Sequence, residues 1–71
     1  MVNTNMLKGK LTEHGMNVEM MAKHLEMDTS TLYRRISNSE TFTIGEADKI
    51  SRILGLSKDE VGAIFFSQYV A

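Results

Sequence analysis

Apolar residues recur at helical spacing in residues 17–25. The i, i+3, i+4, i+7 spacing that places side chains on one face of a helix is followed by Val18, Met21, Ala22 and Leu25. Asn17, immediately before them, is a favourable N-cap residue. The pattern predicts a short helix that begins at Val18 and buries one face.

A second helix is predicted after a turn at residues 26–28. Asp28 is a strong N-cap candidate, and Leu32 and Ile36 lie four residues apart on one face. At about 100° per residue, the opposite face carries Thr29, Ser30, Tyr33, Arg34 and Ser37. We therefore expect one buried face and one face available to a partner, followed by a polar loop over residues 37–41.

Three further helices are predicted on either side of this pair. The first follows the cap candidates at residues 3–5, buries Leu7 and Leu11, and stops at Gly15. Capping boxes predict two more helix starts, at Thr43 with Glu46 and at Ser57 with Glu60, and inward positions of the earlier of these are Ala47, Ile50, Ile53 and Leu54. Hydrophobic staples support four starts: Met16 with Met21, Met27 with Leu32, Phe42 with Ala47, and Leu56 with Val61.

The expected fold class is therefore all-α, with five helices in one domain over residues 1–71. A chain of 71 residues with 42% hydrophobic content buries only one modest core. Residues 41–44 taken alone also suit a strand. The chain has no Cys and no apolar run approaching ~20 residues, so we expect no disulfide and no membrane partner. The start lacks a secretion signal, which predicts a cytoplasmic protein.

The charge balance does not favour nucleic acid. Eight Lys and Arg face nine Asp and Glu, a formal net charge of −1. DNA-binding domains usually carry a basic excess, because their affinity depends on releasing counterions from phosphates. Any DNA contact therefore requires local clustering of basic residues, and the balance equally suits a protein-binding module.

The run of residues 17–36 resembles the helix-turn-helix of the lambda-repressor-like family of phage and bacterial regulators. Ala22 stands where that motif has a small residue between crossing helices, and its core positions match Leu25, Met27, Leu32 and Ile36. Residues 32–38, residues 41–44 and the ending Ile64-Phe65-Phe66 are similar to small phage Cro-like and CI-like repressors. The resemblance implies a five-helix lambda-repressor-like domain with its helix-turn-helix at about residues 17–38.

The resemblance also implies a partner, double-stranded operator DNA, with the third helix in the major groove. The implied base contacts are Thr29, Ser30, Tyr33 and Arg34, and the implied phosphate contacts are Asn17, Thr41 and Thr43. Without the resemblance, exposed Thr, Ser and Arg residues are most often only solvated. Arg35 is expected to pair with an acidic neighbour, and a solubilising role is expected for Lys8, Lys10, Lys49, Arg52 and Lys58.

Two features depart from the family pattern. Glu26 occupies a turn position that often carries Gly, so it either strains the turn or changes its shape. Acidic residues border the motif, namely Glu19, Glu26 and Asp28. They leave open an alternative, in which this face binds a phage repressor protein and the chain acts as an antirepressor.

The chain offers no pattern for catalysis or metal binding. His14 and His24 are ten residues apart, with no zinc motif, Cys pair or carboxylate cluster joining them. We therefore expect no enzyme activity, no metal, no cofactor and no small-molecule substrate; His14 suits a helix C-terminus instead.

The last predicted helix carries two apolar stripes. One stripe is Val61, Ile64, Phe65 and Gln68, and the other is Phe66, Tyr69 and Val70. The second stripe either packs on the same core or forms the face of a homodimer. A dimer would bind half-sites about one turn, ~34 Å, apart.

Overall fold

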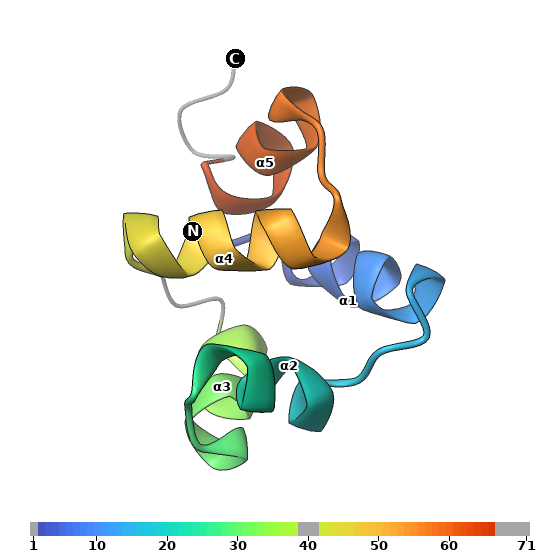
Figure 1. Ribbon diagram of the computed structural model, residues 1–71. Helices are drawn as coiled ribbons and strands as arrows, with labels where there is room; N and C mark the ends of the chain where they lie inside the picture. Colours follow the sequence, from blue (N-terminus) through green and yellow to red (C-terminus); the bar gives the residue numbers. More distant parts are fainter. Residues whose placement is uncertain (1, 39–41, 67–71) are drawn as a thin grey trace.

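A computed structural model describes residues 2–38 and 42–66, and within them every regular element is a helix. The helices are α1 (Thr4–Glu13), α2 (Val18–Leu25), α3 (Thr29–Ser37), α4 (Ile44–Leu54) and α5 (Lys58–Phe65). Helix α4 runs between α5 on one side and the α2–α3 pair on the other (Figure 1). The expected all-α class is confirmed. Ile44, considered above as part of a strand, is the first residue of α4.

Side-chain caps fix most of the helix starts. The Asn3 and Asn17 side chains accept hydrogen bonds from the backbone N–H groups of Met6 (3.1 Å) and Met20 (2.9 Å). Both predicted capping boxes form, at Thr43 with Glu46 and at Ser57 with Glu60. Each box satisfies two backbone donors that the helix itself leaves without a partner.

The prediction that the Asp28 side chain caps α3 is wrong. Asp28 occupies the N-cap position of α3, but its side chain makes no cap hydrogen bond. The start of α3 is held instead by the Asp28 carbonyl, which accepts from Leu32 N–H at 3.1 Å, and by Met27, which packs against the core. The exposed carboxylate still lies where the partial positive charge of the helix N-terminus favours it.

The turn between α2 and α3 contains a left-handed residue. Glu26 has φ 55° and ψ 44°, while the Met27 N–H donates to the Ala22 carbonyl at 2.9 Å. Helices α1 and α4 end with the same hydrogen-bond pattern, but at Gly15 (φ 64°) and Gly55 (φ 61°). Glu26 thus adopts the left-handed conformation that favours Gly, so of the two outcomes considered for it we expect strain and not a changed shape.

Replacing Glu26 with Gly should stabilise the domain by roughly 0.5–1 kcal/mol, because Gly adopts this conformation without a Cβ clash. Urea unfolding measures the change. Glu26→Ala is the matched control, since it removes the same charge but keeps the Cβ. Equal stability of the two variants would contradict the strain.

The core is formed by apolar residues from all five helices. Its buried members are Val2, Leu7, Leu11, Met21, Ala22, Leu25, Leu32, Ile36, Ala47, Ile50, Leu54, Ile64 and Phe65. The predicted inward faces are thus confirmed, with Val18 and Ile53 partly buried. Val2 was not predicted; it is buried where the Asn3 N–H donates to the Ile64 carbonyl at 2.7 Å. Within the described residues, no helix combines the length and apolar character needed to cross a membrane.

The solubilising role expected for Lys10 is also wrong, because its side chain links α1 to α5. Its ammonium pairs with Glu60 of α5 and lies 3.2 Å from Glu13 Oε2. The hydrogen bond from Lys10, followed by that from the Ser57 N–H, lowers the pKa of Glu60 to about 2 from its ordinary value of 4.5. The carboxylate therefore serves both the cap of α5 and the contact with α1.

Acid should weaken this link. The depressed pKa of Glu60 stabilises the folded state fully above pH 4.5, and this contribution is lost as the pH falls toward 2. Unfolding by urea across this pH range measures the loss. Glu60→Gln should lose less stability between pH 5 and 2.5, since the amide still caps α5 but does not titrate. An identical acid dependence in both proteins would contradict this role.

Phe66 does not lie on a second apolar stripe of α5, contrary to expectation. Helix α5 ends at Phe65, and Phe66 is its C-cap with φ −127°, so it no longer follows helical spacing. Phe66 is 37% exposed. Gln68, Tyr69 and Val70 lie outside the described residues.

Candidate nucleic-acid interface

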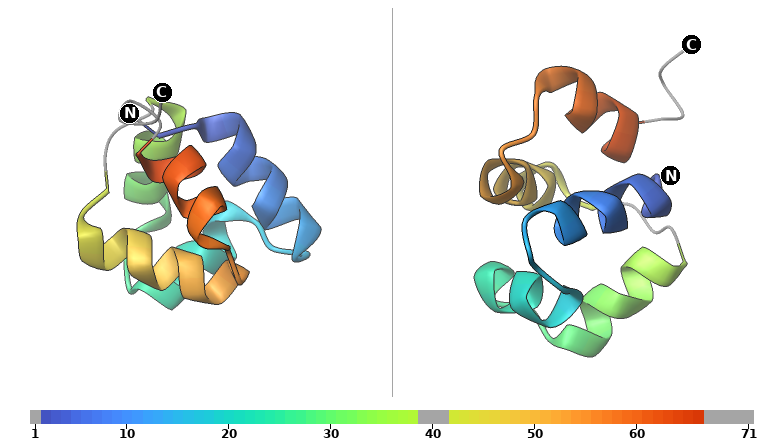
Figure 2. Two further views of the ribbon diagram at one scale, coloured as in Figure 1. Left: turned by 90° about the horizontal axis from the view of Figure 1, so that it is seen from above. Right: turned by 90° about the vertical axis from the view of Figure 1, so that its right-hand side faces the viewer.

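Helix α3 lies at the end of the molecule away from α5 (Figures 1 and 2). Leu32 and Ile36 are fully buried on its inner side. Its outer side carries the four predicted base contacts, all exposed: Thr29, Ser30, Tyr33 and Arg34. Tyr33 is a large hydrophobic residue that is 60% exposed. The structure thus brings these four side chains together on one helix, whose opposite face is buried in the core.

The C-terminal half of α3 is tied to two other helices. The Thr4 hydroxyl of α1 donates to the Ile36 carbonyl at 2.8 Å. Arg35 pairs with Glu46 of α4 at 2.7 Å, which confirms the expected acidic neighbour. The Thr4 contact spans 32 positions, and no local pattern indicates it. These contacts fix the direction in which the exposed face of α3 points.

The predicted phosphate contacts differ in what they can still donate. Asn17 caps α2 through its Oδ1 atom, which leaves its amide NH₂ group at an exposed helix N-terminus. Thr43 donates its N–H to Glu46 Oε1 (2.8 Å) and accepts from Glu46 N–H (3.1 Å), so both of these groups are used by the capping box. Thr41 lies outside the described residues.

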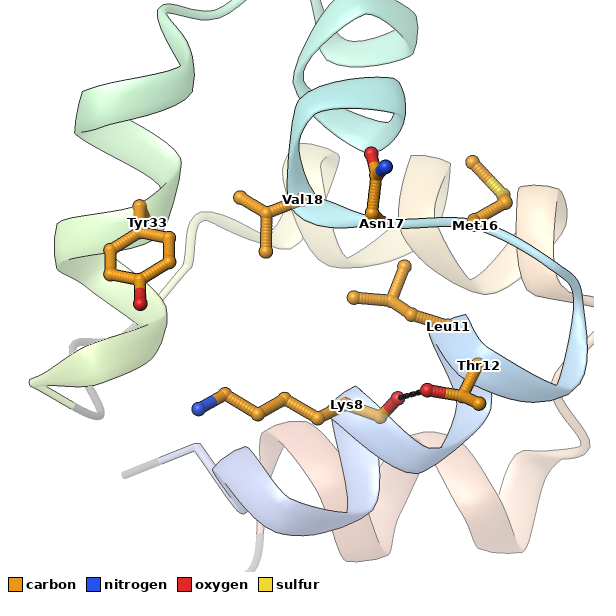
Figure 3. A pocket seen from close by; sticks show the side chains of 7 residues that line it. All are labelled: Lys8, Leu11, Thr12, Met16, Asn17, Val18 and Tyr33. Atoms are coloured by element: carbon orange, nitrogen blue, oxygen red, sulfur yellow. Dashed lines mark hydrogen bonds between the residues drawn. The ribbon is translucent and has the colours of Figure 1, made fainter.

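An open groove separates α1 from the N-terminus of α2 and from α3. It has a volume of about 290 Å³ and is lined by Lys8, Leu11, Thr12, Met16, Asn17, Val18 and Tyr33. The Lys8 side chain extends across it toward Tyr33 (Figure 3). The local sequence pattern predicts only a solubilising role for Lys8, because nothing in that pattern places α1 across from α3.

This arrangement of an exposed helix, an anchored C-terminal half and a flanking groove can be compared with known proteins. A family model described as helix-turn-helix matches residues 7–61. The chain belongs to the lambda-repressor-like helix-turn-helix family. The expected family is confirmed, and the helix-turn-helix domain is that of a DNA-binding transcriptional regulator. Comparisons with curated proteins and with solved structures gave no match.

Acidic side chains border the helix-turn-helix. Glu19 of α2, Glu26 of the turn and Asp28 before α3 are all exposed. Glu19 lies 4.0 Å from Lys23 in an exposed pair, which stabilises α2 only slightly. The local charge around α3 is therefore mixed, unlike a simple basic patch. In the described part of the chain, no group of three or more His, Cys, Asp or Glu side chains could hold a metal ion.

Proposed function

We propose that the protein is a phage-type transcriptional regulator that binds operator DNA sequence-specifically, with α3 in the major groove. The observation that carries this proposal is the exposed polar face of α3 on a helix that is buried on its other side. Arg34 is assigned a bidentate contact to guanine, and Thr29 and Ser30 contact bases through their hydroxyls. Tyr33 packs on a thymine methyl group or reaches a phosphate. Binding would occlude a promoter, and such a regulator acts in the cytoplasm, where the genome lies.

The flanking groove would hold the sugar-phosphate backbone. Lys8 supplies a positive charge, and Asn17 supplies an amide and a helix N-terminus. Thr43 lies outside this groove, at the start of α4, and is assigned a separate phosphate contact. Thr41 keeps its assignment from the family pattern. The polar rim and apolar floor of the groove suit the phosphates and the sugars of one DNA strand.

The proposal is tested by selection from a pool of random DNA duplexes. Repeated rounds of binding at low salt should enrich one sequence, and its affinity should fall steeply with added salt. A duplex with the same composition in scrambled order is the control. Failure to enrich any sequence at low salt would refute the proposal.

Lys8→Ala should lower affinity for the selected and the scrambled duplex by a similar factor. Each phosphate contact contributes about 0.9 to the slope of log affinity against log salt, so the slope should fall by about one. Fluorescence anisotropy over a salt series measures both effects. Lys58→Ala is the control, because it removes the same charge from α5, at the other end of the molecule. If the two variants behave alike, Lys8 makes no phosphate contact.

The second candidate function is an antirepressor that binds the DNA-binding face of a phage repressor. The exposed carboxylates of Glu19, Glu26 and Asp28, together with the net charge of −1, favour this partner. The two functions predict opposite effects of changing all three residues to their amides. DNA binding should strengthen when the repulsion from phosphates is removed, whereas capture of a repressor domain should weaken. Calorimetric titration with each partner decides between them.

Homodimerisation is proposed through Phe66, with Tyr69 and Val70 completing the face. The exposed ring of Phe66 at the end of α5 supports this. Sedimentation equilibrium of the wild type and of Phe66→Ser tests it. A wild type that remains monomeric at high concentration would exclude this dimer.

A further inference from the structure

The side chain of Arg35 connects α3 to α4 and lies over an aromatic ring. Its Nη1 atom donates to both carboxylate oxygens of Glu46, at 2.7 and 2.8 Å. Its Cζ atom lies 5.9 Å from the centroid of the Phe42 ring. That ring meets Phe65 of α5 edge-on, with centroids 5.8 Å apart and an interplanar angle of 87°. One guanidinium thus joins the exposed helix to two other parts of the fold.

Glu46 is itself held in place. Its carboxylate accepts from the Thr43 N–H in the capping box of α4, at 2.8 Å. Partial burial raises the pKa of Glu46, but hydrogen bonds from Thr43 and Arg35 outweigh this effect and leave it below its ordinary value. The carboxylate is therefore charged at neutral pH and offers Arg35 a fixed anchor.

We infer that Arg35 is a positioning residue for DNA recognition, setting the orientation of α3 through Glu46 and Phe42. The inference rests on the proposed function, in which α3 contacts bases. Arg35 directly follows Arg34, so their shared backbone transmits any rotation of α3 to the base-contacting face. Helix α3 packs principally against α2, and the Arg35 pair is its ion-pair link to α4 within the described residues.

A positioning role predicts an effect on specificity that exceeds the effect on stability. The side chains of Arg35 and Glu46 are 26% and 22% exposed, so water can solvate the charge that is left when one partner is removed, which limits the loss of stability. A small displacement of α3, in contrast, moves every base contact at once. Loss of the link should therefore leave the domain folded while it reduces discrimination between DNA sequences.

Two variants break the link from opposite sides. Arg35→Met keeps an apolar stem over Phe42, and Glu46→Gln keeps the capping box, since Gln also serves at that position. Each should weaken binding to the selected duplex roughly tenfold, with little change for the scrambled duplex. Arg35→Lys should restore part of the discrimination. Arg52→Met, which breaks the exposed pair with Asp48 (3.0 Å) inside α4, is the matched control.

The readouts separate positioning from the other roles. The slope of log affinity against log salt should stay at the wild-type value in Glu46→Gln and in Arg35→Lys. A fall of about one in Arg35→Met, with no effect of Glu46→Gln, would show a direct phosphate contact and overturn the inference. Equal discrimination in all variants and the wild type would overturn it as well. A wild type that selects no sequence would refute the proposed function, and this role with it.

Discussion

Leu32→Ala is expected to lower the free energy of unfolding by about 3 kcal/mol. Leu32 is completely buried in α3, and truncation removes both its transfer free energy and the packing around it. A domain of this size has only a few kcal/mol of net stability, so the variant should be largely unfolded at 37 °C. Urea unfolding at low temperature, followed by circular dichroism, measures the change.

The matched control is Ile44→Ala. Ile44 is 80% exposed at the start of α4, so the same kind of truncation there should cost under about 0.5 kcal/mol. Similar losses at the two positions would mean that Leu32 is not the packed centre of the helix-turn-helix. Because unfolding also abolishes DNA binding, Leu32→Ala serves as the reference for loss of binding through loss of structure.

Arg34→Ala is expected to weaken binding to the selected duplex by about one to three kcal/mol, or roughly 5- to 150-fold. This is the usual value of a bidentate contact between an arginine and a guanine. Binding to the scrambled duplex should change much less. Fluorescence anisotropy at one fixed salt concentration measures both affinities.

Arg34→Lys distinguishes base contact from charge. Lysine keeps the positive charge but lacks the planar pair of donors that matches guanine, so specificity should still fall. If Arg34→Lys binds both duplexes as the wild type does, Arg34 contacts phosphate and the base contacts must be sought elsewhere on α3. Repeating the selection with Arg34→Ala should also show a relaxed preference at one base pair.

The repeating patterns of the sequence predict the helices and their buried faces because these depend on neighbours three to five residues away. Both capping boxes are of this kind, and so is the buried stripe of Met21, Ala22 and Leu25. Val2 precedes any periodic segment and is buried by contacts with distant residues, so no local pattern indicates it. Asp28 shows the opposite error, in which a favourable residue type occupies the cap position but makes no cap hydrogen bond.

The candidate site is predictable to the same limited extent. The exposed face of α3 follows from helical spacing, whereas the groove with Lys8 requires the fold to place α1 across from α3. The sequence indicates that Arg35 pairs with an acid, but it does not choose among nine carboxylates. Glu46 is selected by the crossing of α3 and α4, which is a property of the folded domain.

The contacts of residues 2–4, at the start of α1, affect the cooperativity of unfolding. Neighbouring residues join remote helix ends there: the Asn3 N–H donates to the Ile64 carbonyl, and the Thr4 hydroxyl donates to the Ile36 carbonyl. If residues 2–4 detach, α3 and α5 lose an anchor in the same event. Opening of the two helix ends should therefore be a single step in hydrogen exchange, although they are 28 positions apart in the chain. Detachment of residues 2–4 thus reaches the helix that is proposed to contact DNA.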